Sequence, residues 1–277
     1  MERNTAKRTL EKLLSVCICL CMLGAMLPAQ VFAEEADTAQ TETVQDTAPK
    51  DTVHLSSADD LIQLAKNCRL DSWSQNRTVV LEADIDLSSV DFNGIPSFGG
   101  TWEGQNHAIT GLSLSQDGSV QGLFRYVQQG ALVRDMTVKG RIKPGGTRAS
   151  VGGIAGSNAG TIENCAFDGV VSGTSQIGGI AGVNTVKGSI NGCTVSGTVY
   201  GSHFVGGVVG QNDGVAANCT NAASVNTTVS QNEVKLNDLT LDNVLKTEKA
   251  NDVTDAGGIA GNNAGVLRAC INRGTIG

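Results

Sequence analysis

The chain has 277 residues, of which 35 are glycine and 4 are proline, and it carries a formal net charge of −7. This length suits one sizeable domain, and the scarcity of proline excludes a disordered chain rich in proline and glycine. The negative charge argues against nucleic acid as a partner, because phosphates require a basic surface, and equally against docking on an anionic membrane.

Residues 1–33 have the pattern of an export signal peptide. A basic start precedes an apolar run at 13–27, and Val31 and Ala33 place small residues at the cleavage positions. A retained membrane anchor is the alternative, but a run of about 15 residues is shorter than the roughly 20 that a bilayer requires. We therefore expect cleavage after Ala33, no membrane span afterwards, and a secreted or cell-surface protein.

Two short regions separate the signal peptide from the rest. Residues 34–52 are acidic, rich in threonine and nearly free of apolar side chains, which predicts a disordered tether. Residues 53–115 follow as an N-terminal cap made of one helix and strands. The strands are expected at 77–87 and 107–114, where apolar and polar residues alternate.

The helix of this cap is expected at 56–67. Ser56 or Ser57 can cap its start, and acidic residues occupy its first turn, where the helix dipole favours them. Leu61 and Leu64, together with Ala65, form one apolar face. Such a helix would close the open end of a stack of strands, because exposed strand edges promote aggregation and solenoids need caps.

Residues 116–277 consist of repeats. The best-preserved copy begins VGGIAGSNAGTIENC at Val151, and an earlier, weaker copy occupies 121–142. Three kinds of position recur in the copies. They are the second glycine of a pair (Gly153, Gly179, Gly207, Gly258), an asparagine (Asn158, Asn184, Asn212, Asn263) and a column of sulfur-containing residues (Met136, Cys165, Cys193, Cys219, Cys270).

A repeat period in the twenties, rich in glycine, asparagine and β-branched residues, predicts an all-β solenoid, or parallel β-helix. One unit would be one coil of two or three short strands, stacked about 4.8 Å from the next coil. The glycines would turn corners where φ is positive or space is short. The asparagines would form a ladder of amide hydrogen bonds from coil to coil.

The cysteine column has three interpretations. Buried free cysteine behaves as a small apolar residue, so one cysteine per coil forms an apolar ladder. A straight row about 5 Å apart does not give the tetrahedral geometry of zinc. A disulfide between neighbouring coils is compatible with the distance alone. Met136 favours the ladder, because methionine forms no disulfide.

These repeats resemble the GLUG-motif family of bacterial exported proteins. The matching elements are GGIAGSNAGTIENC, GGVVGQNDGVAANC and GGIAGNNAGVLRAC, and the leader at 81–114 is also similar. The resemblance implies a right-handed parallel β-helix in a large surface protein, either adhesin-like or a non-catalytic region of an IgA-specific metallopeptidase. It implies no catalytic residue.

No catalytic arrangement stands out in the sequence. Asp84 and Asp86 are two residues apart on an expected strand, but they fit its polar face, and His107 suits a structural hydrogen bond better than general-base work. Asp168 and Asp213 occupy different places in the repeat, and no zinc-peptidase motif is present. We expect no enzyme activity, no metal and no cofactor. A basic group at Arg141, Lys143 and Arg148 is expected to be a solvated surface.

A polar insertion near 230–255 interrupts the third unit. It is either a recognition loop on a rigid stack or a drifted coil that packs on its neighbour. The sequence also stops in mid-repeat at Gly277, which predicts a truncated array.

Three functions are compatible with these features. The first is a structural and adhesive scaffold at the cell surface that displays loops to a host or cell-surface glycan or protein, as a monomer or part of a longer chain. The second is a non-catalytic accessory region of a larger secreted peptidase or glycan-active enzyme. The third is a small catalytic β-helix, for which the sequence offers no acid–base pair.

Overall fold

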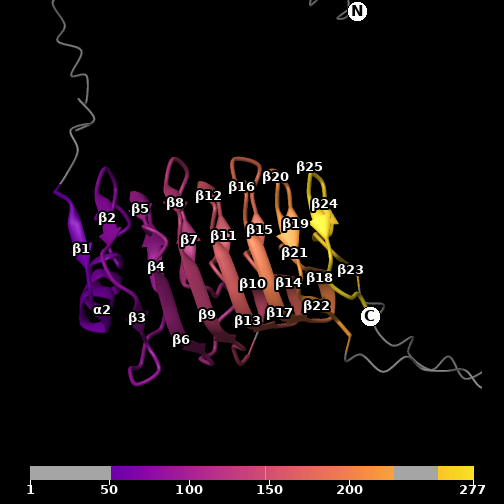
Figure 1. Cartoon of the computed structure of the whole chain (residues 1–277), viewed down its shortest axis with the longest axis horizontal. Coiled ribbons are helices and arrows are strands. Elements are labelled where there is room, and N and C mark those ends of the chain that lie inside the picture. The colour runs from indigo at the N-terminus through magenta and orange to yellow at the C-terminus, as the bar shows by residue number, and fades with distance from the viewer. Residues whose placement is uncertain (1–50, 147, 228–254) are drawn as a thin grey trace, which may run out of the picture. The chain divides into compact units, whose positions relative to one another are not determined.

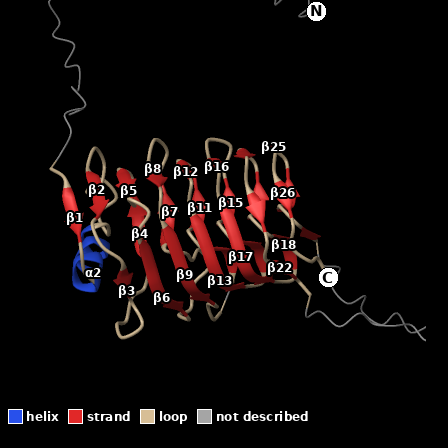
Figure 2. Cartoon of the chain, viewed as in Figure 1, coloured by secondary structure: helices blue, strands red, loops and turns tan. Residues whose placement is uncertain are grey.

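The computed structural model describes residues 51–146, 148–227 and 255–277. The signal peptide expected at 1–33, nearly all of the tether expected at 34–52 and nearly all of the insertion near 230–255 lie outside these residues. Within the described ranges, no helix is long and apolar enough to cross a bilayer. The described chain contains one helix and many short strands, which lie side by side as successive coils (Figures 1 and 2).

The strands form four sheets, and every strand pairing is parallel. Sheet I contains β1 (Val53–Leu55), β2 (Thr78–Leu81), β5 (Thr101–Glu103), β8 (Leu132–Arg134), β12 (Thr161–Glu163), β16 (Ser189–Asn191), β20 (Val215–Ala217) and β25 (Val266–Arg268). Sheet II contains β3 (Ile85–Asp86), β6 (Ala108–Leu114), β9 (Thr137–Ile142), β13 (Ala166–Ser172), β17 (Thr194–Tyr200), β21 (Thr220–Asn221) and β26 (Ile271–Asn272), and β22 (Ser224–Val225) also pairs with β17.

Sheets III and IV complete each coil. Sheet III contains β10 (Ala149–Gly152), β14 (Ser175–Gly178), β18 (His203–Gly206) and β23 (Ala256–Gly257). Sheet IV contains β4 (Ile95–Phe98), β7 (Phe124–Val127), β11 (Ala155–Asn158), β15 (Ala181–Asn184), β19 (Val209–Asn212) and β24 (Ala260–Asn263). The chain is therefore a parallel β-solenoid, as the repeat predicted. Its right-handed turn, implied by the resemblance, stays a prediction.

A full coil contains four strands, for example β12, β13, β14 and β15, each from a different sheet. The expectation of two or three strands per coil was wrong. The glycine pair forms the corner between sheets III and IV, as expected for these glycines: Gly178 ends β14, and β15 begins at Ala181. The strand expected at 77–87 is divided into β2 and β3, which belong to different sheets.

The core consists of columns of apolar side chains, one residue per coil. Ile162 pairs in register with Ile190, which pairs with Ala216, and all three are fully buried. Val171 and Val199 form a second column on sheet II. Alternation with a period of two directs these side chains inward. Each buried Val or Ile contributes about 1.5–3 kcal/mol relative to exposure, so every coil that buries such residues adds to the stability of the stack.

The helix α2 (Ala58–Asn67) covers the first coil (Figure 2). The Ser57 side chain accepts a hydrogen bond from the Asp60 N–H, so both serines precede the helix, which starts two residues later than expected. The Asp60 carboxylate in turn accepts bonds from the Ser56 N–H and the Ser57 hydroxyl. Leu61 and Leu64 are buried against the core, so the helix shields the apolar end of the stack.

The corners between sheets III and IV require glycine for reasons of space. A Cβ atom on Gly153 would overlap the Phe167 ring, and one on Gly179 would overlap the Val195 side chain. Positive φ occurs elsewhere, directly before the sulfur column: Asn164 has a φ of 50° and Gly192 a φ of 64°. Asparagine and glycine tolerate this left-handed conformation better than other residues.

Candidate binding site

The repeated asparagines form a continuous hydrogen-bonded column inside the stack. The Asn158 amide nitrogen donates to Oδ1 of Asn184 at 2.8 Å, Asn184 donates to Asn212 at 2.8 Å, and Asn212 donates to Asn263 at 2.7 Å. The first three of these residues are fully buried. The column therefore joins coils and is not available to a ligand.

A second asparagine rung was not predicted from the sequence. The Asn221 amide nitrogen donates to Oδ1 of Asn272 at 2.8 Å. Both residues stand two positions after a cysteine, where earlier copies carry Phe167 and Val195. The change from an apolar residue to asparagine at this position in two consecutive copies could have predicted the rung.

The sulfur column is also internal. Each thiol lies within hydrogen-bonding distance of a carbonyl of the preceding coil and of the carbonyl two residues earlier in its own coil. For Cys219 these acceptors are Ile190 at 3.8 Å and Ala217 at 3.1 Å, and Cys193 has the same arrangement. All the cysteines within the described residues are free thiols.

Burial makes the thiols of Cys165 and Cys68 weak acids. Burial raises the pKa of Cys165 to about 12 and that of Cys68, beneath the cap, to about 11. A thiol that stays protonated is a poor nucleophile and a poor metal ligand. Within the described ranges, no cluster of three or more His, Cys, Asp or Glu side chains is placed to hold a metal ion. The column acts as core packing.

The acidic residues near the cap are held by hydrogen bonds within the protein. Asp84 Oδ1 accepts a 2.8 Å bond from the Ala108 N–H and lies 3.1 Å from His107 Nδ1. The Ala108 bond, followed by the His107 bond, lowers the pKa of Asp84. Asp86 accepts two bonds from Ser88, which lower its pKa. His107 thus makes a structural hydrogen bond.

The other acidic and basic residues singled out from the sequence do not converge either. Asp168, on β13, accepts a bond from Ser196, whereas Asp213, beyond β19, accepts bonds from Gln211. The two carboxylates therefore belong to different sheets and do not form a common site. Arg141 and Lys143 are exposed at the end of sheet II.

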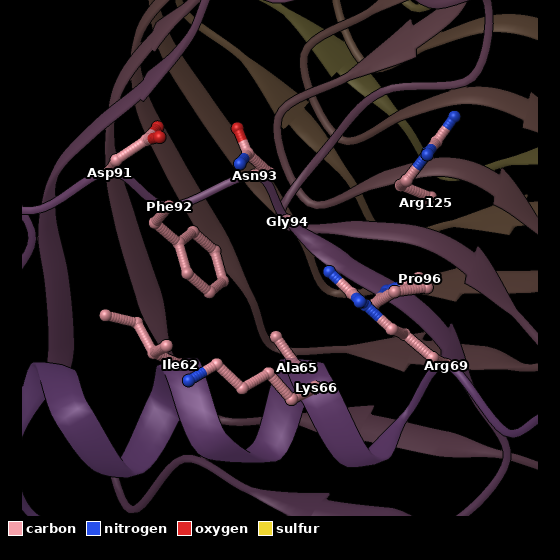
Figure 3. A pocket seen from close by; sticks show the side chains of 10 residues that line it. All are labelled: Ile62, Ala65, Lys66, Arg69, Asp91, Phe92, Asn93, Gly94, Pro96 and Arg125. Carbon is pink, nitrogen blue, oxygen red and sulfur yellow. The ribbon is translucent and has the colours of Figure 1, made fainter.

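The surface is hollowed between α2 and sheet IV. This hollow has a volume of about 260 Å³ (Figure 3). Its lining comes from the helix, the loop before β4, and β4 and β7: Ile62, Ala65, Lys66, Arg69, Asp91, Phe92, Asn93, Gly94, Pro96 and Arg125. A second hollow of about 440 Å³ adjoins it, lined by Asp71, Pro96, Ser97, Arg125 and Tyr126. Pro96 and Arg125 belong to both, so we refer to the two together as the cap groove.

The floor of the cap groove is apolar and its rim is basic. The Phe92 ring points from its loop toward the helix beside Ile62 and Ala65 (Figure 3), and it is only 5% exposed. The Arg69 side chain extends from the end of the helix toward Gly94, and the Lys66 amine lies on the Ile62 side. Asp91 and Asp71 are the acidic residues of the lining.

The basic side chains of the rim lack acidic partners. Among the ion pairs of the described residues, none involves Lys66, Arg69 or Arg125. Arg134, by contrast, makes two bonds to the Glu103 carboxylate, at 2.7 and 2.8 Å. Arg125 donates from Nε to the Val120 carbonyl at 3.0 Å, which fixes the side chain and leaves its terminal nitrogens without a hydrogen-bond partner within the described residues. The rim can therefore accept an external anion.

The fold places this chain among parallel β-solenoids, and comparisons with known proteins add little about its activity. No family model matches the chain. It is 29% identical to halomucin of Haloquadratum walsbyi (strain DSM 16790 / HBSQ001) over 128 residues, which cover 40% of this chain and 1% of that protein. A solved structure described as a "putative immunoglobulin A1 protease" from Bacteroides ovatus gives a TM-score of 0.48 at 18% identity, covering 78% of this chain and 74% of that one.

Proposed function

We propose that this chain is a structural and adhesive segment of an exported cell-surface protein. In this role the β-solenoid is a rigid scaffold that holds a binding surface toward a host or cell-surface glycan or protein. The observation that carries the proposal is the division of polar groups. The repeated asparagines and cysteines are directed inward and bonded from coil to coil, whereas unpaired basic groups gather in the cap groove.

Further support comes from the sequence. The pattern at residues 1–33 favours export, and the resemblance of the repeats to the GLUG-motif family favours a surface protein. The match to halomucin concerns a very small part of a much longer protein, which is compatible with a repeat segment serving as one part of a large chain. A segment of this kind needs no catalytic centre of its own.

The proposal is tested by measuring binding of the chain from Glu34 to Gly277 to arrays of glycans and surface proteins. We expect saturable binding to at least one ligand class and no turnover of polysaccharide substrates. Absence of any binding would contradict the adhesive role. Cleavage of a polysaccharide, abolished by a chelator, would contradict the non-catalytic role and favour a small catalytic β-helix.

A further inference from the structure

We infer that the cap groove binds an acidic sugar residue of a glycan through its carboxylate. This inference rests on the proposed binding function and adds a place on the molecule and a ligand class. It follows from the size of the hollows, the exposed aromatic ring of the second hollow and the basic rim.

The size of the groove favours a compact ligand. The first hollow, at about 260 Å³, is slightly below the range of about 300–1,000 Å³ that is usual for drug-sized ligands. A single sugar ring with one substituent suits this space. An extended peptide would need a free strand edge. The strand β4 is the edge of sheet IV at this end, but α2 packs against it.

An aromatic platform adjoins the basic rim. Tyr126 is 47% exposed, although most other large side chains of this region are buried. Its register partners on either side are Ser97 and Ser157, whose side chains are too short to cover the ring. An exposed tyrosine has an apolar face for the C–H face of a sugar and a hydroxyl for its polar edge.

The rim supplies the charge that an acidic sugar requires. Arg69 and Arg125 each carry a planar guanidinium group, which matches a carboxylate with two parallel hydrogen bonds. Lys66 adds a third positive charge on the helix side. Arg125 lines both hollows, so a carboxylate bound there would place the sugar ring within reach of Tyr126.

A polar group is already oriented in the second hollow. Ser97 is 7% exposed, and its hydroxyl oxygen accepts a 2.7 Å bond from Gln128 Nε2. The same Gln128 nitrogen donates to the Asp71 carbonyl at 2.7 Å. The Ser97 hydroxyl proton is therefore free to donate to a sugar hydroxyl, beside the Tyr126 ring.

The test is a calorimetric titration of the Glu34–Gly277 chain with a tetrasaccharide that alternates glucuronate and N-acetylglucosamine. The control ligand is the same tetrasaccharide after its carboxylates are reduced to alcohols. We expect saturable binding of the acidic form and at least tenfold weaker binding of the reduced form. Binding should weaken as salt is raised, because the rim is exposed to solvent.

Three variants locate the site. Arg69→Gln and Tyr126→Ser should each weaken binding of the acidic tetrasaccharide at least fivefold, and Tyr126→Ser reproduces the residue that its neighbours in the column carry. Arg141→Gln, outside the groove, is the matched control and should leave binding unchanged. Circular dichroism should show that all three variants keep the fold of the parent chain.

Several results would overturn the inference. Equal affinity for the acidic and reduced tetrasaccharides would do so, as would unchanged binding by Arg69→Gln and Tyr126→Ser. If inorganic phosphate bound as tightly as the acidic tetrasaccharide, the groove would be a simple anion site. If an oligoglutamate peptide bound more tightly than the tetrasaccharide, the groove would be a site for acidic protein segments. If the arrays detect a ligand that none of the groove variants affects, this inference fails and the proposed function stands. If no ligand is found at all, both fail.

Discussion

The side-chain amide of Asn184 donates a 2.8 Å hydrogen bond to Asn212 in the next coil while it accepts one of the same length from Asn158 in the previous coil. Both neighbours are fully buried, as is Asn184 itself. A polar residue in successive coils of the core is tolerated because each amide is satisfied by its equivalent in adjacent coils. These amides can be buried because the repeat places an equivalent asparagine in the adjacent coil.

This relationship predicts a position-dependent cost for removing one rung. Asn184→Ala leaves buried partners without their bonds, so we expect a loss of about 2–4 kcal/mol in the free energy of unfolding. Asn263→Ala should cost less than about 1.5 kcal/mol, because water can replace the lost bond at that exposed rung. Urea unfolding followed by circular dichroism measures both. Equal losses would show that the ladder contributes no more inside the stack than at its end.

The apolar column on sheet I offers a second matched pair. Ile190 is fully buried, whereas Leu267, at the same place in the repeat, is 39% exposed. Ile190→Ala should cost about 2–5 kcal/mol through lost burial and a new cavity, and Leu267→Ala should cost less than half as much. The midpoints of thermal unfolding give the order of the two variants. A larger loss for Leu267→Ala would contradict the difference in burial between the two side chains.

The sulfur column predicts a stability change at alkaline pH. Burial raises the pKa of Cys165 from 9.0 to about 12, so the folded thiol keeps its proton where the unfolded thiol loses it. The stabilisation is complete below pH 9 and is lost as the pH rises from 9 to about 12, with a slope of about 1.4 kcal/mol per pH unit for this thiol.

Cys165→Met provides the comparison, because Met136 already occupies the equivalent place one coil earlier. Free energies of unfolding measured between pH 8 and 10.5 should fall less steeply in the variant than in the parent chain. Tyrosine and lysine titration contributes equally to both and cancels in the difference. Identical slopes would mean that Cys165 does not stay protonated in the folded chain.

The repeat itself could be predicted from the sequence because its chemistry recurs at fixed places. Aligning the copies on cysteine puts Cys165 beside Cys193, and the adjoining strands pair in that register. The number of strands per coil was missed, because strands such as β14 and β15 are only four residues long and are separated by a two-residue corner. The crowding of Gly179 against Val195 at this corner is visible only in the structure.

The cap groove could not be predicted in the same way. Arg69 and Arg125 are far apart in the sequence, and neither belongs to a position that recurs in the repeats, so no periodic pattern connects them. Lys66 at the end of a helix has an adequate explanation in the helix dipole alone. The residues come together only because α2 packs on sheet IV beside β4 and β7.

The central claim is that repeat positions serve the fold while the cap groove serves binding. It is tested most directly by measuring ligand affinity and melting temperature together in Arg69→Gln and Asn184→Ala, with the acidic tetrasaccharide as ligand. The account predicts that Arg69→Gln loses affinity at least fivefold with an unchanged melting temperature. Asn184→Ala should melt at a lower temperature and, below that temperature, bind as tightly as the parent chain. The reverse pattern, or equal effects of both substitutions on affinity, would contradict the account.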